Sequence, residues 1–205
     1  MKGMKKKSIG WLVCVVVVMG AMLTALPFSA LAGDPASLVE DLPTVQAYTD
    51  EPVAEEDIQK IVNAGINSPS AMNYQPWHFS VVTDPEVLKE IAEIDMSSGA
   101  QAGVADAPLA IVISCTDGSL FDAGLATQAI SIEAQLLGYG TKIFAAPTVT
   151  MNGEKLPYFR ELLGFPEDQT VACVIIIGRE DHNPDAVSQA STRFDQKDMV
   201  TYITP

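Results

Sequence analysis

Positive charge is scarce in this sequence. Among 205 residues, 12 are lysine or arginine and 26 are aspartate or glutamate, which gives a net charge of −14 at pH 7. Four of the lysines lie within the first seven residues, so residues 33–205 carry the remaining eight cations and all 26 acids. A surface of this sign repels nucleic acids and the anionic face of a membrane. We therefore expect no nucleic-acid partner.

Cysteine and histidine are also rare, and the motifs of common hydrolases are missing. Beyond residue 32 only Cys115, Cys173, His78 and His182 remain. Each cysteine falls in an apolar run, so we expect buried free thiols rather than a disulfide framework, and no zinc site. The sequence has no Gly-x-Ser-x-Gly turn, no Gly-Lys-Ser/Thr phosphate loop and no His-Glu-x-x-His pattern. The sequence motifs therefore give no support for a hydrolase.

The first 32 residues have the pattern of a secretory signal. Lysines precede an apolar run from Ile9 to Leu26, and Ala30–Ala32 supplies small residues at the spacing of a cleavage site. The pattern predicts cleavage after Ala32, export to a secreted or periplasmic location, and a folded domain at residues 33–205. The alternative is an uncleaved membrane anchor, because the apolar run can nearly span a bilayer.

Helical and strand patterns alternate along the folded part. Apolar spacing and capping residues predict helices at residues 54–66, 85–94, 122–137 and 154–163. Apolar runs predict strands at 77–82, 109–115 and 171–178. Strands mixed with helices in this way indicate one layered α/β or α+β domain.

The helix expected at residues 122–137 is unusually apolar. After Asp122 at its first position, Glu133 is its one charged residue. A helix with so little charge needs cover on nearly every side. We therefore expect it to be buried in the core or at a subunit interface.

The segment from Asn67 to Trp77 joins a predicted helix to a predicted strand and is dense in hydrogen-bonding groups. It contains two prolines, two serines and side-chain amides beside aromatic residues. One interpretation is a rigid turn held by proline and local hydrogen bonds. The other is a loop that holds a planar, hydrogen-bonding ligand. Composition alone favours the turn.

The same loop resembles the Pro-Ser-Ser/Ala-x-Asn-x-Gln-Pro-Trp signature of the flavin-dependent nitroreductase family. Other segments agree with that family in order and spacing, and the resemblance runs from about Leu42 to Ile203. These segments are residues 48–53 before the first helix, Asp122–Gly124, Gly138–Gly140, and Leu162–Pro166 before the last strand.

The resemblance implies a fold and a chemistry. The fold is an α+β three-layer sandwich, with a mostly antiparallel sheet flanked by helices, in an interlocked homodimer that holds a flavin at each interface. The chemistry is reduction of flavin mononucleotide (FMN) by NAD(P)H, then electron transfer to a small-molecule acceptor such as a nitroaromatic or a quinone. The flavin supplies the redox chemistry, so no catalytic side chain is assigned.

The resemblance also assigns cofactor-binding residues. Ser68, Pro69, Ser70 and Asn73 would meet the flavin ring, whereas Thr44, Gln46 and Arg193 would face the phosphate.

The phosphate end departs from the family pattern. Family members carry arginines where residues 42–46 read Leu-Pro-Thr-Val-Gln. Thr44 keeps a hydroxyl, but Gln46 cannot replace the charged, bidentate contact of an arginine. We therefore expect FMN to bind more weakly than in typical members. Ala145–Ala146 also replaces a Gly-Gly pair near the ring, which is a milder change.

Three functions remain open. The first is an exported FMN oxidoreductase supplied by NAD(P)H. The second is a non-enzymatic relative that has lost flavin affinity and binds another planar ligand or a partner in the same cleft. The third is a flavoprotein that receives electrons from another exported redox protein, because soluble NAD(P)H is scarce outside the membrane. The missing arginines favour the second, whereas the intact loop and Arg193 favour the other two.

Overall fold

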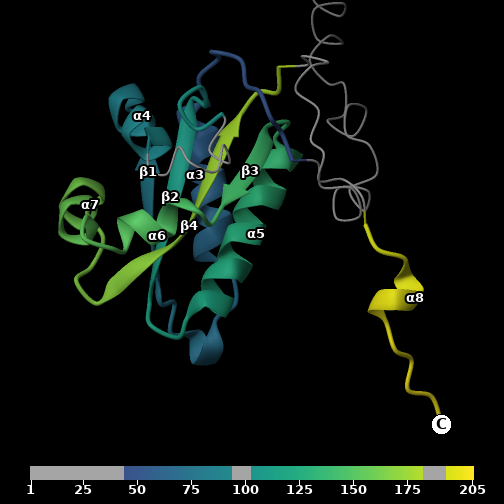
Figure 1. Ribbon diagram of the computed structural model, residues 1–205. Coiled ribbons are helices and arrows are strands. Elements are labelled where there is room, and N and C mark those ends of the chain that lie inside the picture. Colours follow the sequence, from purple (N-terminus) through teal and green to yellow (C-terminus); the bar gives the residue numbers. More distant parts are fainter. Residues whose placement is uncertain (1–43, 94–102, 182–192) are drawn as a thin grey trace, which may run out of the picture. The chain divides into compact units, whose positions relative to one another are not determined.

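The computed structural model describes residues 44–93, 103–181 and 193–205. Its centre is a four-stranded sheet in the order β1-β2-β4-β3, and each neighbouring pair is antiparallel. The strands are β1 (Trp77–Val82), β2 (Leu109–Thr116), β3 (Gly140–Phe144) and β4 (Gln169–Gly178) (Figure 1). The predicted signal at 1–32 and His182 lie outside the described residues. None of the helices described is both long and apolar enough to cross a membrane.

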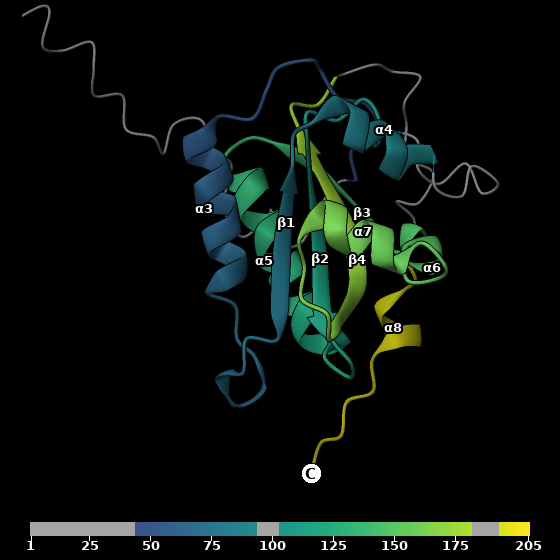
Figure 2. The same cartoon turned by 90° about the vertical axis from the view of Figure 1, so that its left-hand side faces the viewer.

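Helices cover both faces of the sheet. α3 (Glu55–Ile66) and α5 (Leu120–Leu136) lie on one face, whereas α4 (Pro85–Glu93), α6 (Pro147–Met151) and α7 (Leu156–Leu163) lie on the other (Figure 2). Alternate side chains of β4 point to opposite faces of the sheet and so join the apolar cores on both faces. Val174 and Ile176 lie in the same core as Phe159 of α7. Ile175 and Ile177 point the other way, into the cluster beneath α3 and α5. The expected three-layer α+β sandwich with an antiparallel sheet is confirmed.

The predicted helices and strands are all present, with ends shifted by no more than two residues. Four elements are not predicted by the sequence patterns: the 3₁₀ turn η2 (Ala71–Asn73), β3, α6 and the short helix α8 (Gln196–Met199). The Gly138–Gly140 turn ends α5 as expected, but the chain then enters β3 directly at Gly140 instead of continuing as a loop. α6 contains two threonines and a valine, which are weak helix formers, so no helical pattern marks it.

The long helix α5 buries Ile130 together with small and polar side chains, and exposes several large apolar side chains. Asp122, Thr127 and Ser131 are buried toward the sheet, and the Ser131 hydroxyl lies 2.8 Å from that of Thr141. Leu120 and Phe121 are 66% and 76% exposed. The core of a single chain therefore covers only part of this helix. The subunit-interface alternative stays a prediction.

Two cysteines lie on neighbouring strands, and both are free thiols, as expected. Cys115 is buried and Cys173 is partly buried. Burial raises the pKa of both thiols, so they stay protonated near neutral pH. They therefore act as small apolar groups in the core beneath α5.

The hydroxyl of Tyr48 is buried and has no hydrogen-bond partner within the described residues. Burial, and then the charge of Glu180, raise its pKa. We expect Tyr48→Phe to increase the free energy of unfolding by about 1 kcal/mol, because it removes an unsatisfied polar group. Tyr139→Phe is the control, since the Tyr139 hydroxyl donates to Asp57 at 2.9 Å and its loss should destabilise. Urea denaturation measures both, and a less stable Tyr48→Phe would contradict the prediction.

Candidate functional site

The loop between α3 and β1 has an unusual backbone. It contains one turn of 3₁₀-helix at Ala71–Asn73, and Met72, Asn73 and Gln75 have φ values of 49°, 60° and 50°. Asparagine tolerates this left-handed region, but methionine and glutamine rarely adopt it. Residues held in sparsely populated conformations cost of order 1–3 kcal/mol each and cluster at functional sites. The loop is therefore a stronger candidate site than its composition alone suggested.

Hydrogen bonds hold this strained conformation in place. Asp122 at the start of α5 accepts the backbone N–H of Ala71 at 3.2 Å, and this carboxylate is buried. The Ser70 hydroxyl accepts the backbone N–H of Gln75 at 2.9 Å, which closes the loop on itself. The backbone N–H of Thr116 donates to the carbonyl of Pro76 at 3.1 Å, so the loop is also tied to the end of β2.

The predicted ring-binding residues divide into two groups. Ser68 is buried, and its hydroxyl donates to the Ala64 carbonyl of α3 at 3.1 Å, which suits a structural role. Ser70 closes the loop as described. Pro69 and Asn73 are exposed, and the Asn73 side-chain amide has no partner in the part of the chain that the structure describes. Asn73 is therefore the side chain of this group best able to bind a ligand.

The predicted phosphate-binding segment lies along β3. Thr44 forms a parallel bridge with Thr141, and the backbone N–H of Val45 donates to the Thr141 carbonyl at 3.1 Å. Thr44 is exposed and Gln46 is half-buried. These contacts place a hydroxyl and a side-chain amide side by side at the outer edge of the sheet.

Lys142 on β3 belongs to the same cluster, although the sequence patterns do not mark it. Its Nζ donates to the side-chain oxygen of Gln46 at 2.9 Å and lies 4.9 Å from the centre of the Phe144 ring. Burial lowers the pKa of Lys142. Gln46 and Lys142 are 96 residues apart, so only the fold brings this cation to the segment that lacks arginines.

The two sets of predicted residues lie at opposite ends of the sheet. The strained loop leads into Trp77, which pairs with Cys115 near the end of β2. The Thr44 segment joins Thr141, whose partner Ile177 pairs with Leu109 at the other end of β2. Six positions along a strand span about 20 Å. Figures 1 and 2 show this separation in both views. A single chain therefore does not bring the expected ring and phosphate contacts together.

Arg193, the third residue predicted at the phosphate end, begins the last described segment and is exposed. Residues 182–192 between it and β4 lie outside the described residues. Its assignment to the phosphate stays a prediction.

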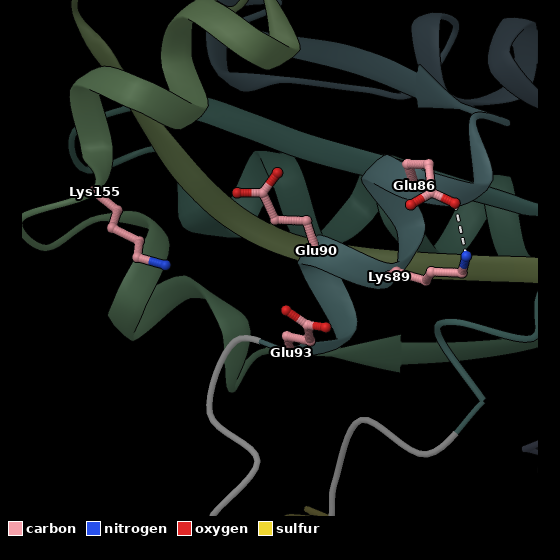
Figure 3. Close-up of a pocket in the computed structure, with 5 residues that line it drawn as sticks. All are labelled: Glu86, Lys89, Glu90, Glu93 and Lys155. Atoms are coloured by element: carbon pink, nitrogen blue, oxygen red, sulfur yellow. Dashed lines mark hydrogen bonds and ion pairs between the residues drawn. The ribbon is translucent and has the colours of Figure 1, made fainter.

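A separate pocket of about 400 Å3 lies between α4 and Lys155, on the face of the sheet opposite α5 (Figure 3). Its lining residues are Glu86, Lys89, Glu90, Glu93 and Lys155. Lys89 pairs with Glu86 at 2.7 Å, and Glu90 accepts the Tyr158 hydroxyl at 2.7 Å. Exposed ion pairs of this kind contribute little to stability. None of the predicted cofactor-binding residues lines this pocket.

Comparisons with known proteins point to one family. A sequence model of the nitroreductase family matches residues 43–113. A protein of Archaeoglobus fulgidus named as an NADH dehydrogenase/NAD(P)H nitroreductase is 36% identical over 144 residues, which is 66% of this chain and 79% of that protein. An FMN reductase (NAD(P)H) of Bacillus subtilis is 27% identical over 194 residues, covering 78% of this chain and 74% of the reductase.

Solved structures share the fold. A nitroreductase with bound FMN from Bacteroides fragilis superposes with a TM-score of 0.70 at 18% identity, covering 84% of this chain and 100% of that one. An FMN-dependent nitroreductase from Clostridium difficile has a TM-score of 0.68 at 26% identity, covering 82% of this chain and 99% of that one. The fold expected from the sequence is confirmed by both.

Proposed function

This chain belongs to the nitroreductase family, and on that premise we propose that it is an exported FMN-dependent oxidoreductase. It would pass electrons from a reduced donor to a small-molecule acceptor such as a nitroaromatic or a quinone. The names of its relatives, an NAD(P)H nitroreductase and an FMN reductase, support this activity and NAD(P)H as the donor. The observation that carries the proposal is the strained loop that presents Asn73.

The residues present fit FMN at both of its ends. At the ring end, the exposed amide of Asn73 offers a donor and an acceptor to the polar edge of a heterocycle. At the phosphate end, the Thr44 hydroxyl and the Gln46 amide are hydrogen-bond donors. When bound, FMN supplies the redox chemistry. The protein's own part is to orient the ring, to satisfy its polar groups and to hold the phosphate.

A homodimer would bring the ring-binding loop and the phosphate-binding Thr44 segment to the same flavin. One chain cannot place both its loop and its Thr44 segment on one flavin, because they lie about 20 Å apart along the sheet. A twofold axis would place the loop of one chain beside the Thr44 segment of its partner, and would create two equivalent sites. The uncharged outer stripe of α5, with Phe121 and Leu136 exposed, supports burial against a second copy.

We also propose that the protein works outside the cytoplasmic membrane. The signal pattern at residues 1–32 supports this location. Since NAD(P)H is scarce there, an exported redox protein is the second candidate donor. Fractionation of cells that express the full chain would test the location, and recovery in the cytoplasm at full length would contradict it.

The purified protein provides the direct test of function. We expect a yellow preparation with a flavin absorbance spectrum, or recovery of that spectrum when FMN is added. We also expect the bound FMN to be bleached by NAD(P)H under anaerobic conditions and reoxidised by a quinone. A protein that binds no flavin at millimolar FMN would contradict the proposal and favour the non-enzymatic relative that binds another planar ligand.

Replacing Asn73 by glycine tests the ring contact. Glycine adopts positive φ freely, so this change removes the amide and keeps the φ of 60°. We expect the melting temperature of the flavin-free protein to change little and FMN binding to weaken about five- to tenfold, as for one lost hydrogen bond. The control is Asn67→Gly, whose amide donates to the Asn63 carbonyl of its own helix. Equal FMN affinity in wild type and Asn73→Gly would assign the loop to turn formation alone.

A further inference from the structure

The amine of Lys142 lies at the segment where the family's arginines are missing. We infer that Lys142 binds the phosphate of FMN and supplies the positive charge that residues 42–46 lack. This inference rests on the proposed function, because it assumes that FMN is the ligand. It assigns the charge to β3 rather than to the N-terminal segment.

The contacts fix the amine beside the other phosphate donors. Nζ of Lys142 lies 2.9 Å from the side-chain oxygen of Gln46. The Thr44–Thr141 bridge sets the N-terminal segment in register with β3, one residue before Lys142. The amide of Gln46 and the ammonium group of Lys142 therefore meet at one edge of the sheet, beside the residue that carries the Thr44 hydroxyl. This set of donors suits a phosphate, which offers only acceptors.

Gln46 has a different role in this arrangement from the one expected. Its oxygen accepts from Lys142, so its amide nitrogen is left to face other acceptors, and it contacts the Thr44 carbonyl only at 3.5 Å. A neutral amide orients the ammonium group and does not cancel its charge, as a carboxylate would. A glutamine at this position is therefore a positioning residue for Lys142 as well as a donor of its own.

Because Lys142 is partly buried, a bound anion would interact strongly with its amine and change the pKa of that amine. Lys142 is half-buried and stacks on the Phe144 ring. Burial lowers the pKa of the amine because the charged form loses hydration. A phosphate bound beside it would raise that pKa again, and charges interact more strongly where water is partly excluded.

Comparing the affinities for FMN and for riboflavin distinguishes a contact with the phosphate from contacts with the rest of the flavin. Riboflavin has the ring and the ribityl chain of FMN but no phosphate. We expect the wild-type protein, titrated with each by fluorescence quenching, to prefer FMN about ten- to hundredfold, the range of one charge-assisted contact. We expect Lys142→Met to lose most of this preference while its riboflavin affinity changes less than twofold. Lys142→Arg should keep the preference, because it keeps the charge.

Lys155→Met is the matched control, since it removes a lysine from the pocket near α4, which none of Thr44, Gln46 and Lys142 lines. It should leave both affinities unchanged. Lys142→Gln serves the same test as Lys142→Met if the latter does not fold. A variant without charge at position 142 that keeps the full preference for FMN would overturn the inference and leave the proposed function standing. A wild-type protein that binds neither flavin would overturn both.

Discussion

Replacing Gly140 by alanine is expected to push the Thr44 segment away from β3 and to weaken FMN binding as a consequence. A Cβ atom built at Gly140 would collide with Cγ2 of Val45 and lie 2.9 Å from its Cβ. Val45 is 2% exposed and packed in the core, so it has little room to move. Inserting a carbon into a packed site costs about 1–3 kcal/mol of stability. Thermal denaturation and FMN titration measure the two effects.

A second substitution checks the cause. Val45→Ala removes both Cγ atoms, so the double variant Val45→Ala/Gly140→Ala should recover part of the stability that Gly140→Ala loses. Val45→Ala alone should destabilise, because it leaves a cavity in the core. Additive effects of the two changes, with no recovery, would show that Gly140 does not contact Val45. Unchanged FMN affinity in Gly140→Ala would separate the Thr44 segment from the phosphate.

The layered fold follows from the sequence because its main elements carry strong local signals. β2 and β4 are continuous apolar runs, and the apolar stripe of α3 repeats with helical period. β3 carries no such signal, since Gly140, Thr141 and Lys142 interrupt any alternation of apolar side chains. Its position depends on pairing with β4 and on the hydroxyl contact between Thr141 and Ser131. Contacts between distant residues place β3, and local patterns do not predict them.

The candidate site divides in the same way. The loop was predictable from its motif, but its positive φ angles at Met72 and Gln75 were not. One of the contacts that hold the loop is to the distant Asp122, and no local pattern predicts that contact. The contribution of Lys142 depends on a bridge between segments almost 100 residues apart. The separation of the ring and phosphate ends follows from the strand register, which the sequence patterns did not resolve.

Gly124→Arg is expected to convert the proposed dimer into monomers. Gly124 lies on the exposed side of α5, and a Cβ there would have no atom within 4 Å in a single chain. Arginine is a better helix former than glycine by up to about 1 kcal/mol, so the monomer should be no less stable. At a helix–helix interface the same side chain would bury an unpaired charge. Such a charge costs about 3–5 kcal/mol, which weakens the dimer by at least a hundredfold.

Sedimentation equilibrium at micromolar concentration measures the change in oligomeric state. Glu161→Arg is the control, because Glu161 is an exposed residue of α7, on the opposite face of the sheet. The control should remain dimeric. Flavin binding should fall with the dimer, since the loop of one chain and the Thr44 segment of the other would no longer meet. A monomeric Gly124→Arg that binds FMN as tightly as the wild type would mean that one chain completes the site. The separation of the loop and the Thr44 segment along the sheet argues against that outcome.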